Sequence, residues 1–182
     1  ISKAFVRLIL KEGAVLEISI LPLQSSQLDD VLEIYKQCED FLALGPVPYA
    51  SMEMVKADFE HSQKSGGVFC GIFNENKKIL GIVDYIPRNF ENNPREAFLE
   101  LLMIAAPYRG IGIGEKVVQI IEQEIIKDPQ INTICSGVQV NNPQAIRFWK
   151  KQGYQISSGP RHLPDQTTAY ELKKTMRNKR KK

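Results

Sequence analysis

The chain is poor in the residues from which disulfide frameworks, metal sites and membrane segments are built. It has three cysteines, far apart in the sequence, and two histidines among 182 residues. This set does not form a disulfide scaffold and offers few metal ligands. No apolar run approaches the roughly 20 residues of a membrane helix, and charges near the start disfavour a secretory signal. We therefore expect a metal-free cytoplasmic protein with reduced thiols and no membrane association.

Basic residues are concentrated at one end of the chain. The formal net charge is +3, but residues 173–182 carry seven basic side chains and no acid, which leaves −4 for the remainder. We expect this tail to be a solvated end, with binding to phosphates of a nucleic acid as the less favoured alternative. The length indicates one domain. We assign residues 15–172 to it, 1–14 to an N-terminal extension or added strand, and 173–182 to a basic C-terminal tail.

The hydrophobic pattern predicts strands and helices in alternation. Strands are expected at 16–20, 68–73, 79–86, 98–105, 133–140, 154–158 and 168–172. Two helices are expected between the first two strands, the second of them capped by Ser51. A further helix is expected over 112–127, and another begins at Pro143 with Asn142 as its N-cap. The order predicts an α/β protein with a mixed sheet and helices on both faces.

The most informative stretch is an apolar strand followed by a glycine-rich loop and a helix. The run 98–105 breaks at Pro107, and Gly110, Gly112 and Gly114 then alternate with isoleucine before the helical pattern. Free N–H groups at a helix N-terminus bind phosphate, and glycine lets a ligand approach the backbone closely. The spacing matches neither a P-loop nor the Rossmann fingerprint. We therefore expect a phosphate-bearing ligand at a different kind of loop.

Two segments resemble the GNAT superfamily of acetyl-CoA-dependent N-acetyltransferases. The spacing Arg109-x-x-Gly112-x-Gly114 resembles the pyrophosphate loop of that family. Residues 142–154, NPQAIRFWKKQGY, resemble its Asn-x-x-Ala-x-x-Phe-Tyr-x-x-x-Gly-Phe segment. The resemblance covers about residues 16–172 and is clearest over 100–154. It implies a central, mostly antiparallel sheet that is splayed between its middle strands, 98–105 and 133–140, with acetyl-CoA bound as co-substrate in the splay.

The resemblance also assigns cofactor contacts to particular residues. Backbone N–H groups of the loop would bind the pyrophosphate: Arg109, Gly110, Ile111, Gly112, Ile113 and Gly114. The backbone of Ile104 and Ala106 would pair with the pantetheine arm, and the Ile104 N–H would donate to the oxyanion of the reaction. Further contacts are expected from Asn142, Arg147 and Trp149, although Arg147 as an exposed helix residue and Trp149 as a packing residue are alternatives.

Acetyl transfer to an amine benefits from a base, because an alkylammonium has a pKa near ~10.4. Glu100 is the only charged residue in 98–105 and matches the strand glutamate that many family members use. Strict alternation along the strand places Glu100 on one face with Leu102 and Ile104. A glutamate that reaches solvent at the groove is the alternative. Asp84 is the second candidate for base or for amine recognition.

The acceptor site is less well defined by the sequence. By resemblance, Phe41, Leu44 and Tyr49 would line it, while ordinary packing is an equal alternative for each. His61 and His162 lie outside both motifs, so we expect surface or loop positions for them. Trp149 stands where the family commonly has a tyrosine acid, and an indole N–H does not serve as a proton-transfer acid near neutral pH.

Three functions remain open from the sequence. The leading one is an N-acetyltransferase that acts on the primary amine of a cationic small molecule by direct attack in a ternary complex. The second is a protein acetyltransferase that modifies a lysine or an N-terminus. The third is an acyl-CoA sensor without turnover, since the usual acid is missing. A homodimer is also left open, because edge-strand dimers are common in the family.

Overall fold

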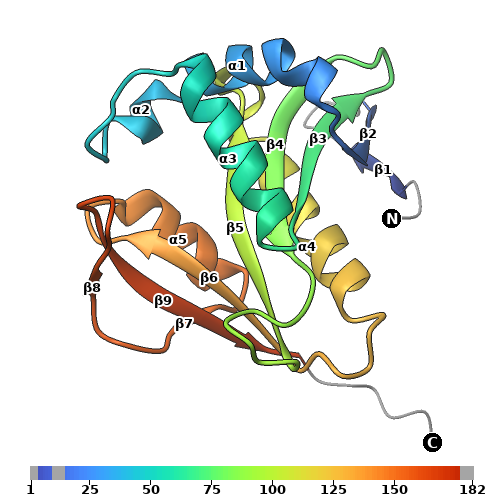
Figure 1. Cartoon of the computed structure of the whole chain (residues 1–182). Helices are drawn as coiled ribbons and strands as arrows, with labels where there is room; N and C mark the ends of the chain where they lie inside the picture. The colour runs from blue at the N-terminus through green and yellow to red at the C-terminus, as the bar shows by residue number, and fades with distance from the viewer. Residues whose placement is uncertain (1–3, 10–14, 177–182) are drawn as a thin grey trace, which may run out of the picture.

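A sheet of nine strands forms the centre of the part of the chain, residues 4–9 and 15–176, that the computed structural model describes (Figure 1). The strands are β1 (Ala4–Ile9), β2 (Val15–Pro22), β3 (Val68–Asn74), β4 (Ile79–Ile86), β5 (Glu96–Ile104), β6 (Thr133–Gln139), β7 (Gln155–Ile156), β8 (Arg161–His162) and β9 (Thr168–Thr175). Their order is β1-β2-β3-β4-β5-β6-β9-β7, with β8 also on β9. Pairing between named strands is antiparallel except for β5 with β6, so the predicted mixed, mostly antiparallel sheet is confirmed.

Helices cover both faces of this sheet (Figure 1). They are α1 (Leu28–Lys36), α2 (Glu39–Leu42), α3 (Met52–Lys64), α4 (Ile113–Ile125) and α5 (Pro143–Lys151), with 3-10 turns η2 (Ser25–Gln27) and η3 (Ala106–Tyr108). Two hydrophobic cores result. One holds apolar residues of α1 and α3, and the other holds those of α4 with Trp149 of α5. Within the described residues, no helix is long and apolar enough to cross a membrane.

Local sequence signals place two of the helix starts. The Ser51 hydroxyl accepts a hydrogen bond from the Met54 N–H at 3.1 Å and caps α3. The Asn142 side-chain oxygen accepts from the Ala145 N–H at 2.9 Å, and Pro143 follows as the first helical residue of α5. Both predicted caps are confirmed, because each depends only on residues close in sequence.

The two parallel strands at the centre of the sheet separate toward their C-terminal ends. Their pairing runs from Glu96 with Thr133 to Leu99 with Ser136 and stops there. Strand β5 nevertheless continues to Ile104 and β6 to Gln139. This is the predicted splay. Beyond Leu99 and Ser136, the backbone N–H and C=O groups on the facing edges of β5 and β6 do not pair with each other as they would in a continuous sheet.

A β-bulge at Glu100 overturns the simple alternation expected for β5. In the pairing with β4, Asp84 lies opposite Leu101 but Tyr85 lies opposite Leu99, so Glu100 is the extra residue. Leu102 and Ile104 consequently pack with the core beneath α4, whereas Glu100 contacts α3 on the opposite face. The prediction that Glu100 shares a face with Leu102 and Ile104 was wrong, because the bulge shifts the alternation by one residue.

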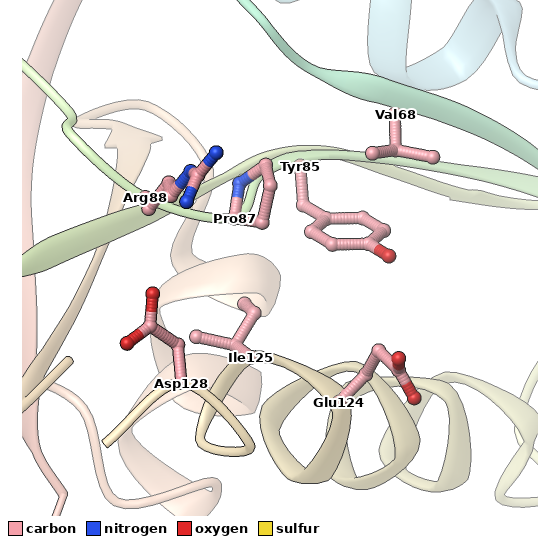
Figure 2. A pocket seen from close by; sticks show the side chains of 7 residues that line it. All are labelled: Val68, Tyr85, Pro87, Arg88, Glu124, Ile125 and Asp128. Atoms are coloured by element: carbon pink, nitrogen blue, oxygen red, sulfur yellow. The ribbon is translucent and has the colours of Figure 1, made fainter. Parts of the chain in front are cut away.

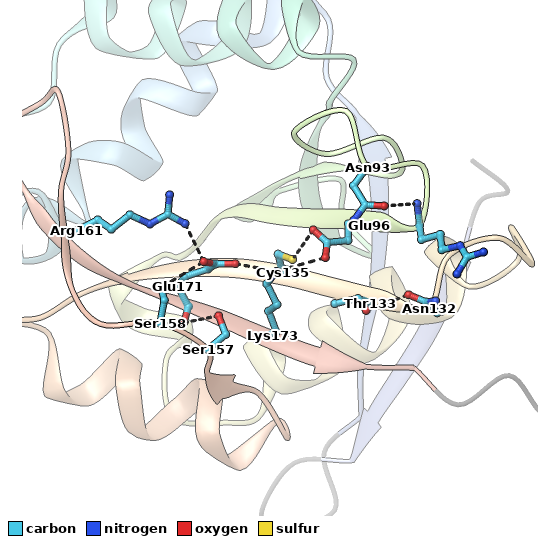
Figure 3. Close-up of polar contacts among 11 residues, drawn as sticks. Asn93, Glu96, Asn132, Thr133, Cys135, Ser157, Ser158, Arg161, Glu171 and Lys173 are labelled. Atoms are coloured by element: carbon cyan, nitrogen blue, oxygen red, sulfur yellow. Dashed lines mark hydrogen bonds and ion pairs between the residues drawn. The ribbon is translucent and has the colours of Figure 1, made fainter.

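The ends of the chain are partly built into the sheet. β1 pairs antiparallel with β2, and residues 1–3 and 10–14 lie outside the described residues. β9 continues to Thr175, so the tail boundary at 173 is too early. Lys173 lies 3.3 Å from Glu96 and 3.0 Å from Glu171 (Figure 3), and Lys174 lies 2.7 Å from Glu122. Two of the seven basic residues are therefore paired in the domain, while residues 177–182 lie outside the described residues.

Candidate active site

The glycine-rich loop reaches α4 through backbone conformations that favour glycine. Gly110 has φ +75° and Gly112 φ +92°, both in the left-handed region that side chains disfavour. Gly112 is the N-cap of α4, and it has no side chain with which to cap the helix. The N–H groups of the first turn are then available to an external anion, which the helix dipole also favours. Ile113 is buried in the core and anchors the loop, so it can offer a ligand only its backbone.

The C-terminal end of β5 presents the backbone of Ile104 away from β4. The next N–H, of Ala105, donates to the Leu80 carbonyl on β4 at 2.9 Å. Since successive residues of a strand point their N–H and C=O groups to opposite sides, those of Ile104 are directed toward the side where β6 has separated. Ala106 lies beyond the strand, in turn η3, and its carbonyl accepts from the Arg109 N–H at 3.4 Å. A ligand can therefore pair with the N–H of Ile104, whose carbonyl already accepts from Arg109 Nε, and strand-like pairing is interrupted at Ala106.

The side chain of Arg109 turns away from the helix N-terminus and binds protein groups. Its Nη1 and Nη2 lie 2.6 and 3.1 Å from the two carboxylate oxygens of Asp40, and Nη2 donates to the Gln37 carbonyl at 3.1 Å. Its Nε donates to the Ile104 carbonyl at 2.7 Å. The hydrogen bonds from Arg109 hold the pKa of Asp40 below its ordinary value. In this arrangement the charge of Arg109 is bound to protein groups, and its backbone N–H already donates to the Ala106 carbonyl.

The second motif forms α5 and packs against the glycine loop. Phe148 lies beside Gly114, where a Cβ would meet its ring at 3.5 Å. Trp149 is 7% exposed and makes edge-to-face contacts with Phe148 and Tyr154, at ring distances of 5.3 and 4.9 Å. Trp149 is thus a core residue, which agrees with the alternative expectation that it serves in packing. Arg147 is exposed, and the capping bond of Asn142 leaves its side-chain amide N–H groups for a ligand.

Glu100 is the charged residue at the point where the strands separate. Its Oε1 lies 3.1 Å from Nε2 of His61 on α3, and its side chain is 28% exposed. Its Oε2 is buried and, within residues 4–9 and 15–176, has no hydrogen-bond partner. Burial raises the pKa of Glu100, and the neighbouring His61 opposes that rise. A half-buried carboxylate with a free oxygen and a raised pKa is suited to accept a proton.

His61 is the residue of this site that sequence reasoning missed. It belongs to neither motif, and we expected it at the surface. Its ring is 63% exposed but also contacts Glu100. The two residues come together because α3 packs over β3 and β4, beside β5, and because the bulge turns Glu100 toward that helix. No local pattern in the sequence signals either fact.

Asp84 lies behind Glu100 and is more deeply buried. It is 3% exposed, and its Oδ1 accepts a hydrogen bond from the Ser62 hydroxyl at 2.7 Å. The pKa of Asp84 is raised to about 6, because burial and the negative charge of Glu100, which raise it, together outweigh the bond from Ser62, which lowers it. So little exposed surface argues against Asp84 as a direct contact for an acceptor. What remains is a charge close enough to Glu100 for that carboxylate to raise the pKa of Asp84.

Comparison with known proteins agrees with this geometry. The pattern of the acetyltransferase (GNAT) family matches residues 28–154. The chain belongs to this family. It is 36% identical over 81 residues to the probable N-acetyltransferase san of Drosophila melanogaster, a match that spans 44% of each chain. It is 34% identical over 64 residues to N-alpha-acetyltransferase 50 of Danio rerio, a match over 35% of this chain and 38% of that one. Each match thus spans less than half of the curated relative's length.

A solved structure extends the likeness of fold to most of this GNAT chain. Spermidine N-acetyltransferase from Vibrio cholerae, in complex with CoA and spermine, superposes with a TM-score of 0.67. The match covers 87% of this chain and 95% of that one at 14% identity. At such low identity the likeness shows the fold.

A cavity of about 300 Å³ adjoins the C-terminal end of β6 in this GNAT domain. It is lined by Leu44, Gly45, Pro46, Val140, Asn141, Gln166, Thr167 and Thr168. The predicted acceptor residues Phe41, Leu44 and Tyr49 come from the same connection between α1 and α3, and of these only Leu44 lines this cavity. Phe41 packs partly against the core under α1 and α3, and Tyr49 is 73% exposed.

A second cavity, of about 290 Å³, lies far from the glycine loop (Figure 2). In Figure 2, Val68, Tyr85 and Arg88 face Glu124 and Asp128 near the C-terminal end of α4. Because α4 has 13 residues, this end is about 18 Å from Gly112 at a rise of about 1.5 Å per residue. The cavity is therefore separate from the loop.

The thiols of this GNAT chain are buried and held protonated. Cys38, Cys70 and Cys135 are each at most 1% exposed. Burial raises the pKa of Cys70 and of Cys135 to about 12, and that of Cys38 also rises. None of the three is suited to be a nucleophile. In the part of the chain that the structure describes, no group of three or more His, Cys, Asp or Glu side chains could hold a metal ion.

Proposed function

We propose that the protein is an acetyl-CoA-dependent N-acetyltransferase that acts on a primary amine of a cationic small molecule. The observation that carries the proposal is the separation of β5 from β6 beside the N-terminus of α4, which begins at Gly112. Membership of the GNAT family and the likeness to a CoA-bound structure support it. The residues around the splay fit the cofactor: a helix terminus without a side-chain cap suits a pyrophosphate, and an open strand end suits the amides of pantetheine.

The residues would divide the work as follows. The backbone N–H groups of 110–114 hold the pyrophosphate, and the Asn142 amide binds farther along the cofactor. The Ile104 N–H donates to the acetyl oxygen and stabilises the negative charge that develops there. When bound, acetyl-CoA supplies the activated acetyl group. Glu100 accepts the proton that the attacking amine must lose, directly or through a water molecule.

The body of the chain has the charge expected for a cationic acceptor. Residues 1–172 carry a net charge of −4, and Asp58, Asp84 and Glu100 gather near the splay, since the charge of Asp58 raises the pKa of each of the other two. The Vibrio cholerae structure contains the polyamine spermine. The name of the zebrafish relative supports a second candidate, the N-terminal amine of a protein, since it is an N-alpha-acetyltransferase.

The proposal is tested by thiol release from acetyl-CoA against a panel of acceptors: spermidine, an aminoglycoside, free amino acids and peptides with free N-termini. Calorimetry on the same sample measures acetyl-CoA binding. Release that depends on one class of amine would support an acetyltransferase and identify its acceptor class. Binding without release from any amine favours an acyl-CoA sensor. No binding would refute the assignment of the loop at 109–114.

A variant pair tests the assigned base. Glu100→Gln keeps the shape of the side chain but removes its basicity, so we expect kcat to fall at least about 100-fold while acetyl-CoA affinity is retained. Glu75→Gln, on the exposed turn between β3 and β4, is the matched control and should behave as the parent protein. An unchanged kcat in Glu100→Gln at every pH would exclude Glu100 as the base.

A further inference from the structure

The connection between α1 and α3 is held to both sides of the splay. We refer to residues 37–45 as the α2 segment. Arg109, in the loop after β5, binds the carboxylate of Asp40 and the carbonyl of Gln37. Asn141, in the turn after β6, donates its side-chain N–H to the carbonyl of Leu44 at 3.0 Å. The α2 segment is thus tied to each of the two strand ends between which the cofactor is proposed to lie.

Apart from Cys38, which is buried in the core, the α2 segment has only partly buried or exposed residues and little structure of its own. Its helix, α2, is four residues long, Glu39–Leu42, and has no fully buried residue. A single helical turn is not stable in isolation, because fixing its backbone costs more than its few hydrogen bonds return. Its order therefore depends on its contacts with the rest of the protein. Segments of this kind open locally at low cost in free energy.

Arg109 connects the glycine-rich loop to the α2 segment, so a change in the position of the loop can change the position of the segment. It makes four close contacts with three groups, namely both oxygens of Asp40, the Gln37 carbonyl and the Ile104 carbonyl. A guanidinium has donors in a planar fork that can serve all of them at once. The side chains of Arg109 and Asp40 are 36% and 64% exposed, and such exposed pairs add little to global stability. The main effect of the contact between Arg109 and Asp40 is therefore to hold the α2 segment in position, not to stabilise the whole protein.

We propose that Asp40 is a positioning residue that, through Arg109, makes the order of the α2 segment depend on cofactor bound at the adjacent loop. The inference rests on the proposed function in one respect, that CoA binds at residues 109–114. A bound pyrophosphate fixes the backbone of Arg109, which restricts where its guanidinium can lie and so holds Asp40. Leu44, Gly45 and Pro46, which line the 300 Å³ cavity, are then held in place after the cofactor has bound.

Hydrogen–deuterium exchange of the full chain, with and without saturating CoA, tests the proposal without knowledge of the acceptor. The amides that report on the α2 segment are those of Phe41, Ala43 and Gly45, which donate within it. In the parent protein we expect CoA to slow exchange at 110–118 and, at least about threefold, at 41–45. In Asp40→Asn, CoA should still slow exchange at 110–118 but should no longer slow it at 41–45. Asp40→Glu, which retains the carboxylate, should restore part of the slowing at 41–45.

Asp30→Asn is the matched control. Asp30 is an exposed aspartate on α1, and its variant should behave as the parent protein in both regions. Slower exchange at 110–118 with no change at 41–45 would overturn the coupling and leave the proposed function intact. So would an equal change at 41–45 in the parent and in Asp40→Asn. Unchanged exchange at 110–118 in the parent protein would overturn the proposed cofactor site and the coupling together.

Discussion

The buried carboxylate of Asp84 is expected to destabilise the protein near neutral pH. Burial raises its pKa to about 6, against about 4 for an aspartate in an unfolded chain. Between these two pH values the folded protein holds a proton that the unfolded chain has released, so the free energy of unfolding falls as the pH rises through this window. At about 1.4 kcal/mol for each pH unit, the loss is about 3 kcal/mol and is complete above pH 6.

Asp84→Asn removes this cost while keeping the shape of the side chain and an oxygen for the Ser62 hydroxyl. At pH 7.5 we expect the variant to unfold roughly 5–10 °C above the parent protein, and at pH 4 the two should unfold together. Asp29→Asn, an exposed position on α1, should change the free energy of unfolding by less than about 1 kcal/mol. Thermal unfolding followed by circular dichroism between pH 4 and pH 8 measures the difference.

The same variant separates stability from activity. If the charge of Asp84 serves the neighbouring site at a cost in stability, the stabilised variant should turn over more slowly. A variant that is no more stable than the parent protein at pH 7.5 would refute the argument, since it would mean that the ionised carboxylate is well satisfied where it lies.

Two further substitutions probe the site and the sheet. His61→Ala removes the partner of Glu100 Oε1, so we expect kcat to fall between about 10- and 100-fold with acetyl-CoA affinity unchanged; an unaltered pH–rate profile would contradict a role in positioning the base. Gly81→Ala would place a Cβ 2.3 Å from the Met103 carbonyl oxygen, so urea unfolding should show a loss of at least about 1–3 kcal/mol. Gly159→Ala, where a Cβ meets nothing within 4 Å, is its control, and equal stability of the two variants would exclude close strand packing as the cause.

Features of this protein that depend on residues close in sequence were predictable. The caps at Ser51 and Asn142, the glycine loop at 110–114 and strand β4 all appear where the sequence indicates them. Each depends on hydrogen bonds or backbone preferences within a few residues, so periodicity and motif spacing contain the necessary information. The splay of the sheet was predictable for a different reason, namely the resemblance of two motifs to the GNAT family.

Tertiary structure decided how these parts form a site. The bulge at Glu100 turns its carboxylate to the face opposite the one that strict alternation predicts, and only there does it meet His61. Arg109 contacts Asp40 across 69 positions of sequence. The last strand continues through Lys173 and Lys174 because they pair with Cys135 and Ile134 of β6, and acids on neighbouring elements bind their side chains. The sequence by itself determined the loop, the caps and the order of elements, because those depend on local interactions. The protonation and the neighbours of the charged side chains depend on which distant segments pack together, and this is set by the three-dimensional fold.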